Sequence, residues 1–112
     1  MTNNRRKGKR IERWFANELK AVFEAVRRNA GTQSQSGGVD LENTGCFNME
    51  IKGGKSYCYK GIRDMLDQIR EEGNPENFDC VLVKPHYEEP YALMPFDDFL
   101  AILNLMKKEG LL

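Results

Sequence analysis

Two acidic residues and a lysine are spaced in a way that suits metal-dependent chemistry on a phosphate group. Nine residues separate Asp40 from Glu50, and Lys52 follows two residues after Glu50. Carboxylate oxygens are the protein ligands that Mg²⁺ prefers, and waters and substrate phosphates fill its other positions. A nearby ammonium group can orient an attacking water or stabilise developing negative charge. We therefore expect Asp40 and Glu50 to hold Mg²⁺ or Mn²⁺, and Lys52 to assist hydrolysis of a phosphodiester bond.

The segment that carries Glu50 and Lys52 has the pattern of a half-buried strand. Apolar and polar side chains alternate over residues 47–52, and successive side chains on a strand point to opposite faces. Glu50 and Lys52 therefore share one face with Asn48, which can hydrogen-bond to water or to a phosphate. The main-chain carbonyl of Ile51 is a further candidate metal ligand.

Asp40 lies in a second short strand, which we expect to pair with the first. Residues 39–41 precede a turn-rich connection at residues 42–45, as is typical of two strands joined by a short loop. A hairpin would place Asp40 beside Glu50. The alternative is that these residues have no catalytic role. A glutamate and a lysine on an exposed strand form an ordinary surface ion pair, which contributes less than about 1 kcal/mol to stability.

An amphipathic helix is expected over residues 9–26, before these strands. Its apolar residues recur at intervals of three and four: Ile11, Phe15, Leu19, Val22, Phe23 and Val26. Glu12 lies on or beside this apolar stripe, since it precedes Phe15 by three residues. Such a carboxylate is either a border residue that reaches solvent or an inward-pointing acid that completes the metal site.

The rest of the chain predicts a single α/β domain over residues 1–112. Short strands are expected at residues 27–30 and 91–94, a polar glycine-rich loop at 31–38, helices at 59–72 and 96–109, and a strand covered on both faces at 79–84. The order α-β-β-β-α-β-β-α indicates helices that flank a small mixed sheet. The apolar stripe of the last helix is expected to be core, and the alternative is that it forms half of a dimer interface.

The charged residues are unevenly distributed although the net charge is zero. Residues 1–28 contain nine Lys or Arg and three Glu, which gives a net charge of +6, and the remainder carries −6. Residues 1–8 form a basic arm that we expect to be mobile. The basic cluster is either a contact surface for a nucleic-acid backbone or a solvated arm that binds nothing.

The composition also disfavours membrane and disulfide-rich proteins. No apolar run approaches the roughly 18 residues of a membrane span and no signal peptide opens the chain, so we expect a cytoplasmic protein, in the host cytoplasm if a phage encodes it. Cys46, Cys58 and Cys80 are odd in number and lack metal-site spacing, so we expect reduced thiols with packing roles. A cysteine nucleophile would need a nearby histidine, and the sequence contains only His86.

Taken together, these residues resemble the PD-(D/E)xK nuclease superfamily. The similarity is narrower to archaeal-type Holliday junction resolvases and related phage endonucleases, and it covers roughly residues 5–85. The matching features, in order, are Lys7-Gly8, Glu12-Arg13, Arg27-Arg28, a Gly/Ser-rich loop, Asp40 and Glu50-x-Lys52. The resemblance implies a restriction-endonuclease-like α-β-β-β-α-β core, with an extra C-terminal strand and helix, and a homodimer that cleaves branched DNA.

The resemblance also assigns roles to individual residues. It implies that Glu12, Asp40 and Glu50 are metal ligands and that Lys52 is catalytic. DNA contacts are implied for the basic N-terminal residues, one later arginine and the serines of the loop: Arg5, Arg6, Lys7, Lys9, Arg28, Ser34 and Ser36. The chain departs from the family pattern in having Val39 where the superfamily name has proline, and in having few basic residues beyond the N-terminal part.

Other functions fit the same residues. The closest alternative is a nicking or restriction-like endonuclease that acts on ordinary duplex DNA. A nucleic-acid-binding module would use the basic cluster for phosphates, ignore metal and tolerate the loss of Glu50. A protein-interaction domain would use the apolar C-terminal helix. Gln68 is either a residue of the site, as in some relatives, or a solvated helix residue.

Overall fold

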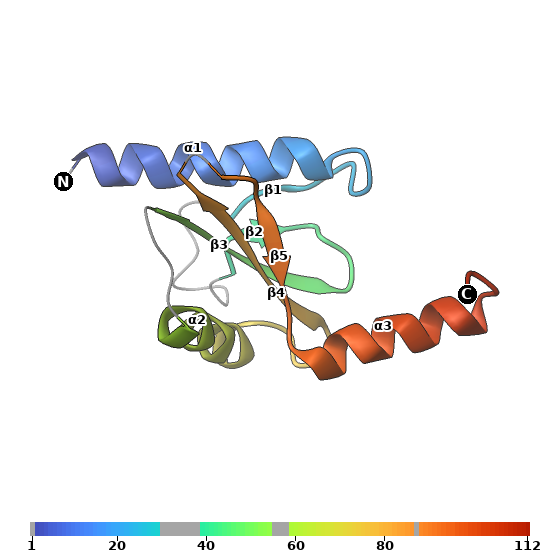
Figure 1. Cartoon of the computed structure of the whole chain (residues 1–112). Coiled ribbons are helices and arrows are strands. Elements are labelled where there is room, and N and C mark those ends of the chain that lie inside the picture. The colour runs from blue at the N-terminus through green and yellow to red at the C-terminus, as the bar shows by residue number, and fades with distance from the viewer. Residues whose placement is uncertain (1, 30–38, 55–58, 87) are drawn as a thin grey trace.

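The computed structural model describes residues 2–29, 39–54, 59–86 and 88–112. Its elements follow the order α-β-β-β-α-β-β-α (Figure 1), so the predicted mixed α/β class and the predicted order of elements are confirmed. The elements are α1 (Thr2–Leu19), β1 (Arg27–Arg28), β2 (Leu41–Glu42), β3 (Phe47–Gly54), α2 (Tyr59–Glu72), β4 (Phe78–Pro85), β5 (Tyr91–Leu93) and α3 (Phe96–Lys108). None of the described helices is long and apolar enough to cross a membrane.

The strands form two sheets rather than one. β3 pairs with β4 in parallel and β4 pairs with β5 antiparallel, which makes a three-stranded mixed sheet. β1 and β2 pair antiparallel with each other in a separate two-stranded sheet. The expected hairpin between the strand of Asp40 and β3 is therefore wrong: β2 pairs with β1, and β3 pairs with β4. Asp40 itself immediately precedes β2.

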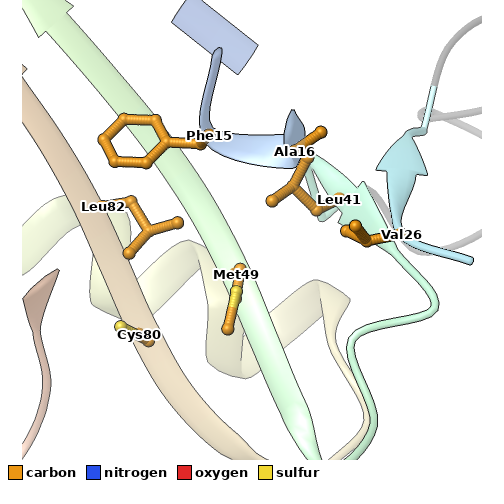
Figure 2. Close-up of a cluster of buried hydrophobic side chains, with 7 residues drawn as sticks. All are labelled: Phe15, Ala16, Val26, Leu41, Met49, Cys80 and Leu82. Carbon is orange, nitrogen blue, oxygen red and sulfur yellow. The ribbon is translucent and has the colours of Figure 1, made fainter. Parts of the chain in front are cut away.

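α1 covers one face of the mixed sheet (Figure 1). Figure 2 shows the buried cluster between this helix and the strands: Phe15, Ala16, Val26, Leu41, Met49, Cys80 and Leu82. Full burial of a large apolar side chain contributes about 1.5–3 kcal/mol, so this cluster fixes α1 on the sheet. The helix approaches β3 so closely at Gly53 that a Cβ atom there would clash with the end of the Ile11 side chain.

α1 begins and ends earlier than the sequence predicts. It starts at Thr2, so most of the segment 1–8, which we expected to be an arm, is helical. It ends at Leu19, whose carbonyl accepts the N–H groups of Val22 and Phe23 over 3.0 and 2.9 Å in a turn that reverses the chain. Val22 is consequently 72% exposed, whereas Val26 enters the core after the turn. A chain that turns back after Leu19 and a helix that continues to Val26 both place apolar residues at intervals of three and four, so the spacing alone does not show where the helix ends.

α2 covers the opposite face of the mixed sheet. Ile69 of this helix is fully buried against Val81 and Val83 of β4. The alternate residues of β4 pack towards α1, so β4 is covered on both faces, as its continuous apolar run predicts. Glu50 is in register with Val81, and Lys52 is in register with Val83. Since registered neighbours point to the same face, Glu50 and Lys52 lie on the α2 side of the sheet.

α3 does not join the core, and the expectation that its apolar stripe packs inside this domain is wrong. None of its residues, all of which the structure describes, is buried. Figure 1 shows the helix extending from one end of the sheet, away from α1 and α2. It is attached near its start, where Asp98 Oδ2 accepts a hydrogen bond from the Asp79 N–H over 2.8 Å. An apolar stripe predicts that a surface is covered, but it does not identify what covers it.

Candidate active site

Asp40 lies where the two sheets meet, and hydrogen bonds of its backbone and side chain hold it there. Its N–H donates to the Met49 carbonyl over 3.1 Å, and its own carbonyl accepts from the Asn29 N–H over 2.9 Å. Its Oδ2 atom accepts from the Ile51 N–H over 2.7 Å. The residue is buried. The carboxylate is therefore fixed against the edge of β3, although β2 does not pair with that strand.

Glu50 is buried beside Asp40, on the face of β3 that α2 covers. The residue is 5% exposed, and its carboxyl group is hydrogen-bonded to the Asp40 side chain. Its Oε1 atom has no hydrogen-bond partner among the residues that the structure describes. An unsatisfied buried polar atom costs about 1–3 kcal/mol. Such an atom calls for an explanation, and the common ones are an ordered water, a bound ion or a catalytic role.

The surroundings of Glu50 raise its pKa from the ordinary value of 4.5 to about 9. Burial is the largest cause, followed by the charge of Asp40 and the hydrogen bond to its side chain, and the charges of Glu72 and Glu12 add to the effect. Without a cation, Glu50 therefore holds a proton at neutral pH. Carboxyl groups with a pKa raised by burial and by a second carboxylate are concentrated at functional sites.

The oxygen atoms around this carboxyl pair fit a hard divalent cation. In a strand, the N–H and C=O groups of one residue point to the same side, so the Ile51 carbonyl lies along the edge of β3 that reaches Asp40. Asp40, Glu50 and Ile51 thus offer carboxylate and carbonyl oxygens, which are the ligands that Mg²⁺ and Mn²⁺ take. The Oε1 atom of Glu50, which has no partner among the described residues, is compatible with such an ion.

Glu12, the expected third ligand, is directed towards Arg28. Arg28 Nε donates a hydrogen bond to Glu12 Oε2 over 2.7 Å, and the two side chains are 19% and 21% exposed. Glu12 is close enough for its charge to help raise the pKa of Glu50. Across the described parts of the chain, however, no three acidic, histidine or cysteine side chains are grouped as a ready-made metal site. The structure therefore brings Asp40 and Glu50 together and leaves Glu12 in an ion pair.

Lys52 and Asn48 share the Glu50 face but have different surroundings. Lys52 is exposed near the end of β3. Asn48 is buried, and its Nδ2 group donates to the Asn74 carbonyl and to Asp79 Oδ1, both over 2.9 Å. Its Oδ1 atom accepts from the Asn74 N–H over 3.2 Å. The expectation that Asn48 binds water or phosphate is therefore wrong, because its amide joins β3 to the segment between α2 and β4.

Sequence reasoning missed Glu72, the last residue of α2. Its charge contributes to the raised pKa of Glu50, and its Oε2 atom accepts a hydrogen bond from Gln68 Nε2 over 3.3 Å. Gln68 and Glu72 are both exposed and flank Ile69, the residue that fixes α2 on the sheet. Their four-residue spacing is visible in the sequence, but the face of the sheet on which α2 packs is not.

A basic groove of about 350 Å³ lies between α1 and β1. Its lining comprises Arg13, Ala16, Asn17, Lys20, Val26, Arg27 and Arg28. Arg28, at one end of the groove, is registered with Leu41, the residue after Asp40. Arg13 lies on α1, and Lys20 follows seven residues later, in the turn directly after the last residue of the helix. This spacing could have been read from the sequence, whereas their proximity to β1 depends on the turn after Leu19.

The structure describes only some of the other residues that we expected to contact DNA. Lys9 is exposed on α1. Arg5, Arg6 and Lys7 belong to the same helix, and their side chains lie outside the described part of the structure. Ser34 and Ser36 lie outside it entirely.

The cysteines show no sign of a nucleophile in the described residues. Cys80 is buried, and burial raises the pKa of its thiol to about 11, which disfavours the reactive thiolate. Cys46 is free and exposed, and Cys58 lies outside the described residues.

Comparison with known proteins identifies no relative of this chain. No family model matches it, and neither a curated protein nor a solved structure matches it.

Proposed function

We propose that this protein is a metal-dependent endodeoxyribonuclease with a PD-(D/E)xK site. The observation that carries the proposal is the Glu50 carboxyl group, which is buried against Asp40 and leaves Oε1 without a partner among the described residues. Two carboxylates held together in this way repel each other and oppose folding, unless a proton neutralises one of them or a cation binds between them. Lys52, two residues further along the same face, adds a cationic group where a phosphate would approach.

Each residue has a defined task in the proposed site. Asp40, Glu50 and the Ile51 carbonyl would hold Mg²⁺ or Mn²⁺, and the Ile51 N–H orients Asp40 for this role. The chemistry that such an ion supplies when bound is activation of a water and clamping of phosphate oxygens. Lys52 stabilises negative charge on the phosphate while the water oxygen bonds to phosphorus and the bond to the leaving sugar oxygen breaks.

DNA as the substrate is supported by the basic groove between α1 and β1. Four cationic side chains line it: Arg13, Lys20, Arg27 and Arg28. Arg27 and Arg28 are ion-paired with Glu42 and Glu12, so Arg13 and Lys20 are the two that we propose to contact backbone phosphates first. The groove ends beside the residue after Asp40. A strand that follows the groove would therefore bring a phosphodiester bond towards the acidic pair.

Branched DNA is the substrate class that we propose within this activity. The proposal rests on the resemblance to archaeal-type Holliday junction resolvases, together with the restriction-endonuclease-like core that it implies. A homodimer with a two-fold axis would present two equal sites to opposite strands, and such an arrangement permits paired cuts in a four-way junction.

A nucleic-acid-binding module is the second candidate, and one observation favours it. Glu12 is committed to Arg28, so the described residues present two grouped carboxylates rather than three. A protein that only binds DNA needs the groove and has no requirement for a third acidic ligand. Such a module would bind DNA equally well with and without divalent cations.

A cleavage assay on a panel of substrates tests the proposal. Labelled four-way junction, flap and linear duplex would be incubated with the wild-type protein and with Glu50→Gln, in Mg²⁺, Mn²⁺ or EDTA. Glu76→Gln is the matched control, because Glu76 is an exposed carboxylate outside the site. Paired cuts in the junction alone, lost in EDTA and in Glu50→Gln, would support a resolvase. Cuts in every substrate would indicate a general endonuclease, and metal-independent binding without cleavage would support the module.

A further inference from the structure

α3 is an apolar helix that lies outside the core of its own chain. Eight of its 13 residues are apolar, and none of its residues, all of which the structure describes, is buried. Phe96 is 70% exposed, Leu105 is 51% exposed, and Phe99 and Leu100 are 45% and 43% exposed. Figure 1 shows that the helix extends away from α1 and α2. The other four apolar residues are half-buried, so a large part of the apolar surface of α3 is uncovered within the described residues.

Such a helix is unfavourable by itself in water. It is about 20 Å long, and isolated helices of this length are marginally stable unless an apolar face is packed. A helix that is apolar over most of its circumference is normally buried on several sides. Contiguous exposed apolar surface of this kind marks a contact site for another macromolecule.

The charges of α3 indicate which partner covers it. The first turn contains Asp97 and Asp98, and the last turn contains Lys107 and Lys108. Two copies of the helix aligned antiparallel would therefore place the acidic end of each against the basic end of the other. A parallel alignment would instead bring acids against acids and lysines against lysines. The antiparallel arrangement also opposes the two helix dipoles, which is favourable.

We propose that α3 pairs antiparallel with the α3 helix of a second copy of this chain around a two-fold axis. A two-fold interface uses the same patch on both subunits, so the patch must be complementary to itself. α3 meets this requirement because its apolar surface lies between an acidic and a basic end. The proposal is independent of the nuclease activity, since it uses no residue of the acidic pair or of the basic groove.

The attachment of α3 leaves Asp97 for this contact. Asp98 Oδ2 accepts a hydrogen bond from the Asp79 N–H over 2.8 Å, which holds the start of the helix to β4. Asp97 is exposed, and so are Lys107 and Lys108 at the other end. The pairing therefore leaves the bond between Asp98 and Asp79 intact and joins Asp97 to the lysines of the second copy.

The molar mass of the protein in solution tests the pairing. Analytical ultracentrifugation of the full chain is expected to give twice the 12.9 kDa of one chain. The variant Leu100→Glu/Leu105→Glu is expected to be monomeric over the same concentration range, with an unchanged circular dichroism spectrum, because both side chains are exposed in the single subunit. Val22→Glu is the matched control, since Val22 is 72% exposed outside α3, and it should remain dimeric.

Charge reversal tests the antiparallel alignment. Asp97→Lys alone and Lys107→Glu/Lys108→Glu alone are each expected to raise the dimer dissociation constant about tenfold or more at low salt. All three substitutions in one chain should return it to within about threefold of the wild-type value, because each end then meets its opposite again. A monomeric wild-type protein would overturn the proposal. A dimer that tolerates Leu100→Glu/Leu105→Glu, or one that the triple substitution does not restore, would overturn it as well.

Discussion

Arg28 donates a hydrogen bond from Nε to Oε2 of Glu12 over 2.7 Å, and this pair lies between the basic groove and the acidic residues near Glu50. The two side chains are 19% and 21% exposed, so they are partly shielded from solvent. Glu12 therefore fixes the orientation of an arginine that lines the proposed path of the DNA backbone. Arg28 in turn neutralises a carboxylate that would otherwise add more repulsion to the Glu50 site.

Breaking this ion pair should reveal a measurable coupling energy. We expect Arg28→Ala and Glu12→Gln each to lower the free energy of unfolding by about 1–2 kcal/mol, because each leaves a partly buried polar partner behind. The double variant should lose about 1 kcal/mol less than the sum of the two single losses. A double-mutant cycle by urea denaturation at pH 7 gives this quantity. Additive losses would show that the two side chains act independently.

The basic groove should contribute to DNA affinity without contributing to chemistry. We expect Arg13→Ala/Lys20→Ala to weaken binding of a four-way junction about tenfold or more, in EDTA at low salt. The slope of log affinity against log salt should also become shallower, by about one for each phosphate that the groove no longer neutralises. Fluorescence anisotropy across a salt series measures both quantities. Lys60→Ala is the control, because Lys60 is exposed on α2. An equal effect of the control variant would show that total charge matters and that the groove does not.

The raised pKa of Glu50 makes the stability of the metal-free protein depend on pH. The folded state binds this proton with a pKa of about 9, above the ordinary value of 4.5. Between these values the folded state holds more protons than the unfolded state, so this group lowers the free energy of unfolding as the pH rises. Glu50→Gln removes the titrating group and should make the protein more stable than wild type by about 1–3 kcal/mol at pH 8.

The same comparison at pH 5 provides the control for this stability prediction. Near pH 5 Glu50 is protonated in the folded protein and only partly ionised in the unfolded chain, so the difference between Glu50→Gln and wild type should be much smaller. Urea denaturation in EDTA at both pH values makes the measurement. A variant that is less stable than wild type at both pH values would contradict the proposed surroundings of Glu50.

Binding of a divalent cation should displace the Glu50 proton. We expect Mn²⁺ to raise the unfolding temperature of the wild-type protein. The apparent affinity of the protein for Mn²⁺ should rise by up to about tenfold per pH unit between pH 6 and pH 8, because one proton leaves for each ion bound. Thermal unfolding across an Mn²⁺ series at each pH measures the affinity. Glu50→Gln should show little Mn²⁺ effect and no such pH dependence. An affinity that does not change with pH in the wild type would place the ion elsewhere.

The fold was predictable from the sequence where one local pattern determines one element. The alternation over 47–52 and the apolar run at 79–84 became β3 and β4, because strand periodicity is decided by neighbouring residues. The end of α1 was not predictable from spacing, since Phe23 and Val26 reach the core through a turn that keeps helix-like intervals. The position of α3 outside the core was not predictable either, because the apolar pattern of a single helix does not identify what covers it.

The part of the candidate site that lies on β3, namely Glu50 and Lys52 on one face of the strand, was predictable from the sequence. Asp40 was expected beside Glu50 by a hairpin, and it reaches β3 instead through hydrogen bonds to Met49 and Ile51. Glu72 was missed, because its distance from Glu50 depends on how α2 packs across the sheet. Long-range pairings of this kind depend on several elements together, so no single segment encodes them.

The central claim is that Asp40 and Glu50 hold a divalent cation for cleavage of DNA, and single-turnover cleavage of a four-way junction tests it most directly. In Mg²⁺ we expect Glu50→Gln and Asp40→Asn to cleave at least about a hundredfold more slowly than wild type, while their junction affinity in EDTA stays within about threefold. Lys52→Ala should slow cleavage with a similarly small change in affinity. Cleavage by Glu50→Gln at the wild-type rate, or equal wild-type rates in Mg²⁺ and in EDTA, would contradict the account.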